Sequence, residues 1–326
     1  MSSILDQVVQ VGVESTYGTA VAPTRAFEAK ADTWQRDVEY IQSVGFRKDQ
    51  QTIRSDRHDT ISIGASGSIE VDVLNKGIGL LLQHALGGSS GPTQQGGTAA
   101  YLQTFETNDV GPATSYTVQV GKVDSNGGLQ AFTYEGSMIT GWNISADLGS
   151  AVSMTFDFDS EAEQNTTALA AASYPSGTDV FVYTDVTVEI DDSAVSTFQS
   201  FSLDADLGLK LDRRYLKGSA VKAQPKRSSL PSYTGSISGE FQTMTNYEKF
   251  VAGTTFKLEL IAQMGTAIAG SYYPKFHITM PVCVFTGSTP TASLDDLTTI
   301  ELPFTVLDNG SDAAVKIEYQ STDTSF

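Results

Sequence analysis

The chain has 326 residues, more than one average domain, and a formal net charge of −18 at pH 7. Its single cysteine, Cys283, excludes a fold held together by internal disulfides. No apolar run approaches the ~20 residues that cross a bilayer, and the opening MSSILDQVVQ lacks the basic and apolar regions of a signal peptide. We therefore expect no membrane insertion and synthesis in a cytoplasm.

Positive charge is concentrated in two windows, residues 47–57 and 210–227, which hold eleven of the twenty basic residues. Because the rest of the chain is strongly acidic, most of its surface should repel polyanions. Nucleic-acid binding is disfavoured, since the larger window offers only Tyr215 for base stacking. Basic loops on an acidic protein instead favour contact with another copy of the same chain, which in a head-to-tail arrangement produces open-ended stacks.

The first stretch in chain order is VQVGVESTYGTAVAPTRAF at residues 9–27, punctuated by Gly12, Gly18 and Pro23. It has neither a nucleophile beside a base nor a metal-binding cluster. Such punctuation indicates an N-terminal arm that lies along a neighbouring subunit. Later segments, such as GSIEVDVL and AVSMTFDFD, alternate apolar and polar residues with the period of two that is typical of β-strands. The sequence therefore predicts a mainly β fold.

Two parts of the chain repeat one order of elements: a strand, a basic loop, a strand that opens with Gly-Ser-Ile, a short helix and further strands. We expect Asn75 to cap the first helix, and Thr245 with Glu248 to form a capping box on the second. This repetition indicates a duplication. The predicted boundaries are an N-terminal arm at 1–23, a first unit at 24–161, a linker at 162–178 and a second unit at 179–326.

Residues that usually carry chemistry are sparse. His58, His84 and His277 have no Cys, Asp or Glu at metal-ligand spacing, and Cys283 has no histidine nearby in the sequence to activate it. The segment DFDSEAE at 157–163 lacks the glycine and the terminal glutamate of a calcium loop. We expect it to form a solvated acidic strand face, with weak calcium binding as the alternative. We predict no catalytic residue, no metal and no cofactor, and hence no enzyme.

The stretch VGVESTYGTAVAPTR, through Gly12, Glu14, the Tyr-Gly-Thr turn at 17–19 and Pro23, resembles the N-terminal signature of tail tube proteins. These are the major tail proteins of long-tailed bacteriophages. The order of strand, basic loop, strand and helix in each half is similar to the tube fold of that family, which extends the resemblance over most of the chain. The resemblance implies two tandem tube-type β-sandwich or barrel units, each with a short flanking α-helix, in a virion tail protein assembled in the host cytoplasm.

The resemblance also implies stacked rings of subunits whose hollow centre passes the genome. A duplicated chain is similar to the variant in which three subunits supply six pseudo-equivalent units; a hexameric ring is the alternative. The second basic loop is longer and more charged than the first, so equal roles for the two loops are not expected. The implied partners are further copies of the chain, the tail tip, tape measure and terminator proteins, and double-stranded DNA in transit without specific binding.

Carboxylates that face the bore of such a tube would repel DNA phosphates. The polar faces of the two Gly-Ser-Ile strands are the first candidates for this role, and a later acidic strand is the second; the alternative is that these faces point outward. The expected lumen-facing residues are Glu70, Asp72, Ser238, Glu240, Asp204 and Asp206. The expected contacts to the adjacent ring are Arg54, Arg57, Arg213, Arg214, Lys217 and Lys222.

Two other classes of protein stay open. One is a different self-assembling injection-tube or sheath protein, which would share the rings and differ in its partners. The other is a secreted β-sandwich adhesin or carbohydrate-binding module. That module would need an exposed aromatic platform, whereas Trp34 and Trp142 lie far apart in the sequence.

Overall fold

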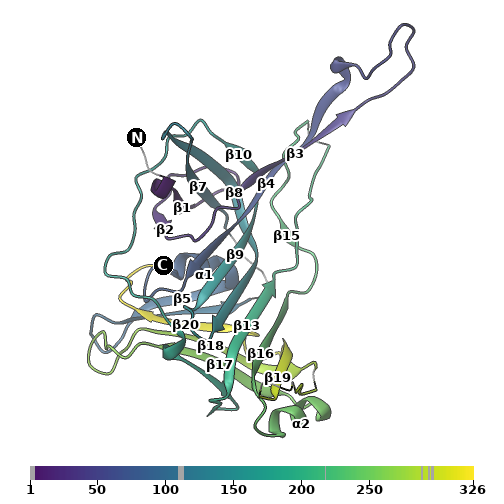
Figure 1. Ribbon diagram of the computed structural model, residues 1–326. Coiled ribbons are helices and arrows are strands. Elements are labelled where there is room, and N and C mark those ends of the chain that lie inside the picture. Colours follow the sequence, from purple (N-terminus) through teal and green to yellow (C-terminus); the bar gives the residue numbers. More distant parts are fainter. Residues whose placement is uncertain (1–3, 109–113, 217, 288, 293, 295–296) are drawn as a thin grey trace.

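The computed structural model describes residues 4–108, 114–216, 218–287, 289–292, 294 and 297–326. These residues form large antiparallel sheets with two short α-helices, which confirms the mainly β fold (Figure 1). The sheets are open, and no closed barrel forms within the described ranges. No helix of the described residues is long and apolar enough to cross a bilayer.

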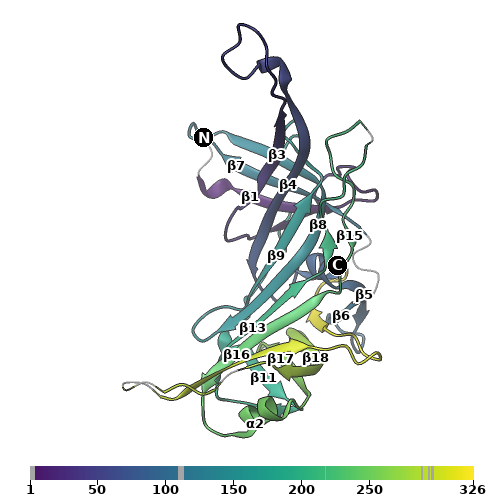
Figure 2. The same cartoon turned by 90° about the vertical axis from the view of Figure 1, so that its right-hand side faces the viewer.

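A large sheet runs through both halves of the chain, and Figure 2 shows its central strands side by side. Each strand is antiparallel to the next. Its strands in spatial order are β3 (Gln35–Gln42), β4 (His58–Asp72), β9 (Ser153–Ser160), β8 (Leu129–Asp147), β13 (Phe198–Asp206), β16 (Ser232–Glu240), β19 (Thr299–Val306) and β18 (Lys275–Phe285).

Each half also contributes a second sheet, because β8 and β18 are long enough to belong to two sheets. In the first half the order is β2 (Arg25–Phe27), β1 (Val8–Val13), β7 (Tyr116–Val123), β8 and β10 (Ala162–Gln164). In the second half it is β12 (Ser193–Ala194), β11 (Val186–Ile190), β17 (Phe256–Gln263), β18 and β20 (Lys316–Ser321), extended by β6 (Tyr101–Thr107) and β5 (Gly87–Gln94). A separate short pair joins β14 (Leu209–Lys210) and β15 (Lys226–Arg227).

The two halves repeat not only the strand order but also its irregularities. The register of β7 on β8 shifts between Tyr116 and Val118, and that of β17 on β18 shifts between Phe256 and Leu258. Bulges of this kind are specific features of a sheet, so their repetition at matching places is strong support for duplication. The division is not clean, however, since β5 and β6 of the first half extend the sheet of the second half.

The core lies between the sheets, where alternate residues of each strand turn inward. On β9, for example, Met154, Phe156 and Phe158 are buried. The Gly-Ser-Ile strands need their glycines because a large side chain fills the space above each one. An added Cβ at Gly67 would lie 2.4 Å from the indole of Trp34, and one at Gly235 would lie 2.6 Å from the ring of Phe304.

The helices form where the apolar spacing indicated, but their caps differ from the expectation. Helix α1 (Gly79–Leu86) begins after Ile78, because Asn75 instead accepts a hydrogen bond from the backbone N–H of Asp179 at 3.0 Å. Helix α2 (Thr245–Ala252) begins after Met244, with no side-chain capping bond. The predicted N-cap and capping box are therefore wrong, since tertiary contacts and the preceding turn decide where each helix begins.

The N-terminal segment is not a free arm. Strand β1 pairs along its whole length with β7, in the position that β11 takes beside β17 in the second half. Its burial is nearly complete, so the interpretation as a segment that lies along a neighbour is wrong for residues 8–13. The expected linker is also packed on its own chain: Ser173 accepts a backbone hydrogen bond from Ala26 at 2.8 Å.

His84 gives a test of the packing around α1. Its imidazole is buried, its Nε2 is hydrogen bonded to the carbonyl of Thr114, and burial lowers its pKa from 6.5 to about 4. Because the folded pKa is the lower one, folding stability should fall as pH drops from 6.5 towards 4, by about 1.4 kcal/mol per pH unit. We expect the stability difference between wild type and H84Q to shift in favour of the variant over this range, measured by urea unfolding. A difference that is independent of pH would contradict the assignment of a buried neutral histidine.

Candidate assembly surfaces

One face of the large sheet is polar across both halves of the chain. One row of directly opposed residues crosses the sheet from β4 to β16. It consists of Glu70, Thr155, Asn143, Asp204 and Thr234. Parallel rows continue the pattern, so the structure brings the carboxylates that the sequence singled out onto one surface. These are Glu70, Asp72, Glu240, Asp204 and Asp206, with Ser238 beside them.

Local contacts hold these carboxylates in place. The Lys30 ammonium lies 2.7 Å from Asp72 and 3.4 Å from Glu70, so one cation serves two carboxylates. Asn143 donates from Nδ2 to Asp204 at 2.6 Å, and the backbone N–H of Gly208 donates to Asp206 at 2.8 Å. The surface stays net acidic, and sequence reasoning missed Lys30 because only the fold places it beside β4.

The first basic window lies at the tip of a hairpin formed by β3 and β4, which projects far from the body (Figure 1). Arg54 forms an ion pair with Asp56 within this tip, and Arg57 lies on the same loop. The tip also exposes apolar side chains that we did not predict: Phe46 is fully exposed, and Val44 and Ile53 are mostly exposed. An exposed apolar and basic tip is typical of a contact with another protein.

The second basic window behaves differently, because it folds back onto the first half of the chain. Val221 forms a bridge with Ile63, and the ammonium of Lys222 forms a buried ion pair with Asp159. Lys222 is therefore not free to contact another ring, which corrects its assignment from the sequence.

The two arginines of this window also have partners within the chain. Arg214 donates to the carbonyl of Ala220 at 2.9 Å, and Arg213 donates to the Tyr215 hydroxyl at 2.6 Å. Lys217 lies outside the described residues. Of the expected inter-ring set, Arg54 and Arg57 thus lie at the short 3-10 helix in the loop between β3 and β4, the hairpin that projects in Figure 1.

The acidic segment at 157–163 is not a uniformly solvated face as expected. Asp157 is exposed, but Asp159 is buried, and burial raises the pKa of its carboxyl while the ion pair with Lys222 partly offsets this. Among the residues that the structure describes, no three His, Cys, Asp or Glu side chains are grouped to hold a metal ion.

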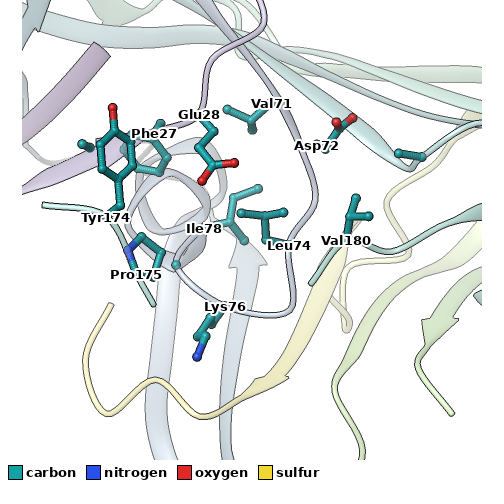
Figure 3. Close-up of a pocket in the computed structure, with 13 residues that line it drawn as sticks. Phe27, Glu28, Val71, Asp72, Leu74, Lys76, Ile78, Tyr174, Pro175 and Val180 are labelled. Atoms are coloured by element: carbon teal, nitrogen blue, oxygen red, sulfur yellow. The ribbon is translucent and has the colours of Figure 1, made fainter. Parts of the chain in front are cut away.

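A cavity of about 210 Å³ opens between β2, the end of β4 and the segment 174–180 (Figure 3). Its lining is mostly apolar, with Phe27, Tyr174 and Pro175 on one side and Val71 and Val180 on the other. No serine, cysteine or histidine of the described residues lines it, and its polar side chains are those of Glu28, Asp72, Lys76 and Tyr174.

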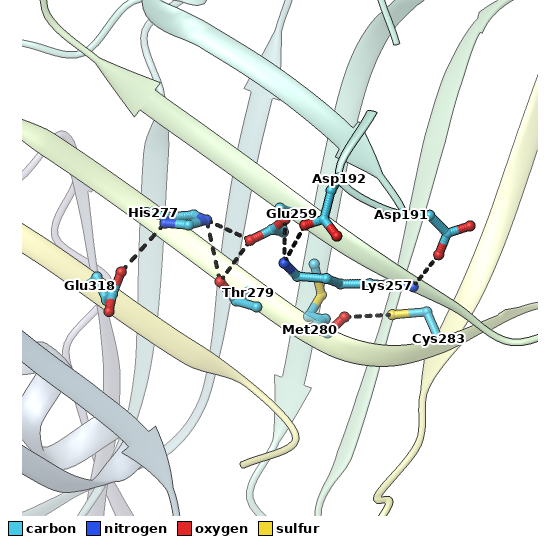
Figure 4. A network of polar contacts seen from close by, with 9 residues as sticks. All are labelled: Asp191, Asp192, Lys257, Glu259, His277, Thr279, Met280, Cys283 and Glu318. Atoms are coloured by element: carbon cyan, nitrogen blue, oxygen red, sulfur yellow. Dashed lines mark hydrogen bonds and ion pairs between the residues drawn. The ribbon is translucent and has the colours of Figure 1, made fainter. Parts of the chain in front are cut away.

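The histidine in β18 belongs to a ladder of charges across β17, β18 and β20 (Figure 4). His277 Nε2 lies 2.9 Å from Glu259, and His277 Nδ1 lies 3.5 Å from Glu318. The adjacent imidazole of His277, with help from Lys316, holds the pKa of Glu318 at about 2. Cys283 is buried nearby, and burial raises the pKa of its thiol to about 12, so the thiol is unreactive at neutral pH. These contacts give His277 and Cys283 a structural role within the sheet.

The two halves meet at a junction that the sequence did not indicate. Residues Gly141–Asp147 of β8 pair with Ser200–Asp206 of β13, in an antiparallel register that makes the large sheet continuous. Gly141 is needed at this place because an added Cβ would lie 2.8 Å from the carbonyl oxygen of Ala205. In the spatial order of the large sheet, β8 of the first half therefore joins β13 of the second half edge to edge.

A family model described as phage tail tube protein matches residues 5–306, nearly the whole chain. The chain therefore belongs to the phage tail tube family, a structural protein of the virion tail. A search of curated proteins found no match.

Proposed function

We propose that this chain self-assembles into stacked rings that form the hollow tail tube of a long-tailed phage, through which DNA passes into the host. The observation that carries the proposal is the large sheet, in which two repeated units are already joined edge to edge as neighbours in a ring would be. Three copies of the chain would supply six such units. Joining all the edges would also remove exposed strand edges, which otherwise invite uncontrolled pairing.

In this arrangement the polar face of the large sheet lines the bore. The opposite face is buried in the core, so the polar face is the one left to meet solvent or cargo. Its carboxylates would repel phosphates, which carry one charge per ~1.7 Å of duplex axis. A pair of charges ~4 Å apart in water interacts by only about 1 kcal/mol, but the sum over many rings keeps DNA from binding to the wall.

The hairpin tip would contact the adjacent ring. It combines Arg54 and Arg57 with the exposed side chains of Val44, Phe46 and Ile53, so it offers both charge and apolar surface to an acidic neighbour. Arg213 and Arg214 would support the same contact from the second loop, where each already has an intrachain partner. The ends of the tube would bind the tail tip and terminator proteins and, during assembly in the host cytoplasm, the tape measure protein.

We expect F46S to leave the stability of the isolated chain within ±0.5 kcal/mol, because the side chain is fully exposed, while tube length decreases strongly. The conservative variant F46L keeps an apolar group at the tip and should form tubes of normal length. Length distributions from negative-stain electron microscopy give the measurement. Normal tubes from F46S would show that the tip does not hold the rings together.

A sheath or another injection-tube protein would share this architecture and differ in its contents. A carbohydrate-binding module is disfavoured by a specific observation: Trp34 and Trp142 are both buried, at 3% and 2% exposure, so neither offers a stacking platform for a sugar ring.

Electron microscopy of the purified chain across a concentration series tests the proposal directly. We expect rings or tubes with a central hole at least as wide as a DNA duplex. The duplex diameter is ~20 Å, since its radius about the axis is ~10 Å. The rotational symmetry would separate a trimer from a hexamer. Particles that stay monomeric at every concentration, with and without purified tail tip complex, would contradict the tube function.

A further inference from the structure

We infer that the ring closes by pairing β3 of one subunit with the segment that follows β18 in the next subunit, in the register that β13 and β8 already show within the chain. This inference rests on the proposed tube function and adds the two edges and their register. The occupant of each edge is a second copy of this chain. The internal junction is the template, because the duplication leaves one equivalent junction without a partner inside a single chain.

The segment after β18 matches the end of β8 in several independent details. The register of β8 on β9 shifts between Ile139 and Gly141, and Thr140 in the bulge donates to the carbonyl of Asp157 at 3.3 Å. In the second half Thr286 donates in the same way to the carbonyl of Pro303, also at 3.3 Å. This threonine is followed by a glycine in each half, Gly141 or Gly287.

The match continues beyond this glycine. Thr291 forms a bridge with Thr299 at the place where Ser145 pairs with Ser153 in the first half. Gly287 therefore corresponds to Gly141, and Thr291 corresponds to Ser145. In the first half this stretch carries β13 on its outer edge; in the second half no strand from the described residues occupies that edge.

The opposite edge is matched by hydroxyl pairs on the polar face. Ser202 of β13 and Ser236 of β16 have their hydroxyls 3.3 Å apart, and Thr33 and Ser68 have theirs 2.8 Å apart. Ser236 and Ser68 are the serines of the two Gly-Ser-Ile motifs, so Thr33 corresponds to Ser202.

This correspondence sets the register of the junction between subunits. Within the chain Asp206 lies opposite Gly141, and Ser202 lies opposite Ser145. The inferred junction therefore places Asp37 opposite Gly287 and Thr33 opposite Thr291 of the neighbouring subunit. A shift by one residue would turn every side chain to the wrong face, so the polar face remains continuous only in registers of this parity.

The glycine at 287 gives a sharp test. At Gly141 an added Cβ would meet the backbone of β13, at 2.8 Å from the Ala205 oxygen. At Gly287 an added Cβ meets only the ring of Pro303, at 3.6 Å, so a side chain fits there in the isolated chain. A neighbour's β3 in the inferred register would bring its own backbone to the place that Ala205 occupies at the internal junction.

We therefore expect G287V to fold with the melting temperature of the wild-type monomer. It should need an at least tenfold higher protein concentration to form rings, measured by light scattering and electron microscopy. The matched control is G265V, because nothing lies within 4 Å of an added Cβ at that glycine; it should fold and assemble normally. Normal rings from G287V would overturn the inferred junction while leaving the tube function intact.

Cysteine pairs test the register itself, since the native Cys283 is fully buried. Directly opposed residues of antiparallel strands lie within disulfide range, while diagonal neighbours do not. The double variant T33C/T291C should form disulfides between subunits that run as covalent dimers and trimers on a non-reducing gel. S145C/S202C should form the equivalent bond within one chain, and the out-of-register pair Q35C/T291C should stay monomeric.

The outcomes separate the two levels of the argument. The inferred register would be overturned if the wild type forms rings but T33C/T291C forms no disulfide between subunits. It would also be overturned if only the shifted pair Q35C/T291C forms one. Absence of rings in the wild type would overturn the proposed function and the junction together.

Discussion

Replacing Lys222 with alanine is expected to destabilise the folded chain by about 3–5 kcal/mol, because the change leaves the carboxylate of Asp159 buried without its cation. The pair links the second basic window to β9 of the first half, so its loss should also release the segment that bridges with Ile63. Urea unfolding at neutral pH, at concentrations below assembly, measures the effect.

The pH dependence of K222A follows from the same carboxyl. Burial raises the pKa of Asp159 even with Lys222 present, and removing the cation raises it further. A group whose folded pKa is raised costs stability above that pKa, and the cost shrinks as pH falls through it. K222A should therefore recover part of its lost stability towards acid pH.

Removal of both charges provides the control for this prediction. Because desolvation outweighs the attraction of the pair, the double variant K222M/D159L should be close to wild type in stability and clearly better than K222A. On the surface, K249A breaks the pair with Asp191 and should cost at most about 1 kcal/mol. A double variant that loses as much stability as K222A would show that the pair stabilises the fold outright.

Replacing Glu14 with alanine should be nearly as damaging, with a loss of at least about 3 kcal/mol, because buried donors are left unsatisfied. The Glu14 side chain is 1% exposed and accepts four hydrogen bonds. The donors are the hydroxyls of Ser115 at 2.6 Å and Thr117 at 2.8 Å, and the backbone N–H groups of Gly18 and Gly136, each at 3.0 Å.

The variant E14Q keeps the shape of the side chain but turns an NH2 group towards donors, so its loss should be intermediate. Thermal unfolding of wild type, E14Q and E14A measures the series. A loss below 1 kcal/mol for E14A would mean that water replaces the carboxylate, contrary to its burial. Glu14 thus has a structural role in the N-terminal signature: it joins the end of β1 to β7 and to Gly136, a positive-φ residue within β8.

Much of the fold was readable from local patterns. Alternation in β4, β9 and β16 correctly separated core residues such as Ile69 and Ile237 from the polar face that carries Glu70. The repeated Gly-Ser-Ile strands indicated the duplication, and the apolar spacing indicated two short helices. These features follow from the period of two in a strand and of 3.6 in a helix, which single segments already contain.

The sequence predicted the assembly surfaces only in part. Both basic windows are rich in Lys and Arg, yet one projects as a hairpin tip (Figure 1) and the other buries Lys222 against Asp159. The predicted helix caps were wrong for a related reason. Asn75 accepts a hydrogen bond from Asp179, which follows the expected linker in the sequence. Partners so distant in the chain leave no local signal.

The sequence by itself determined the mainly β class of the fold and the acidic and basic character of the chain, and it predicted a duplication. Only the tertiary structure decided that β1 is an inner strand, that β5 and β6 complete the sheet of the other half, and that β8 joins β13 edge to edge. The physical reason is that a strand's periodicity specifies which side chains share a face, whereas its neighbour is chosen by hydrogen bonds and packing between segments far apart in the chain.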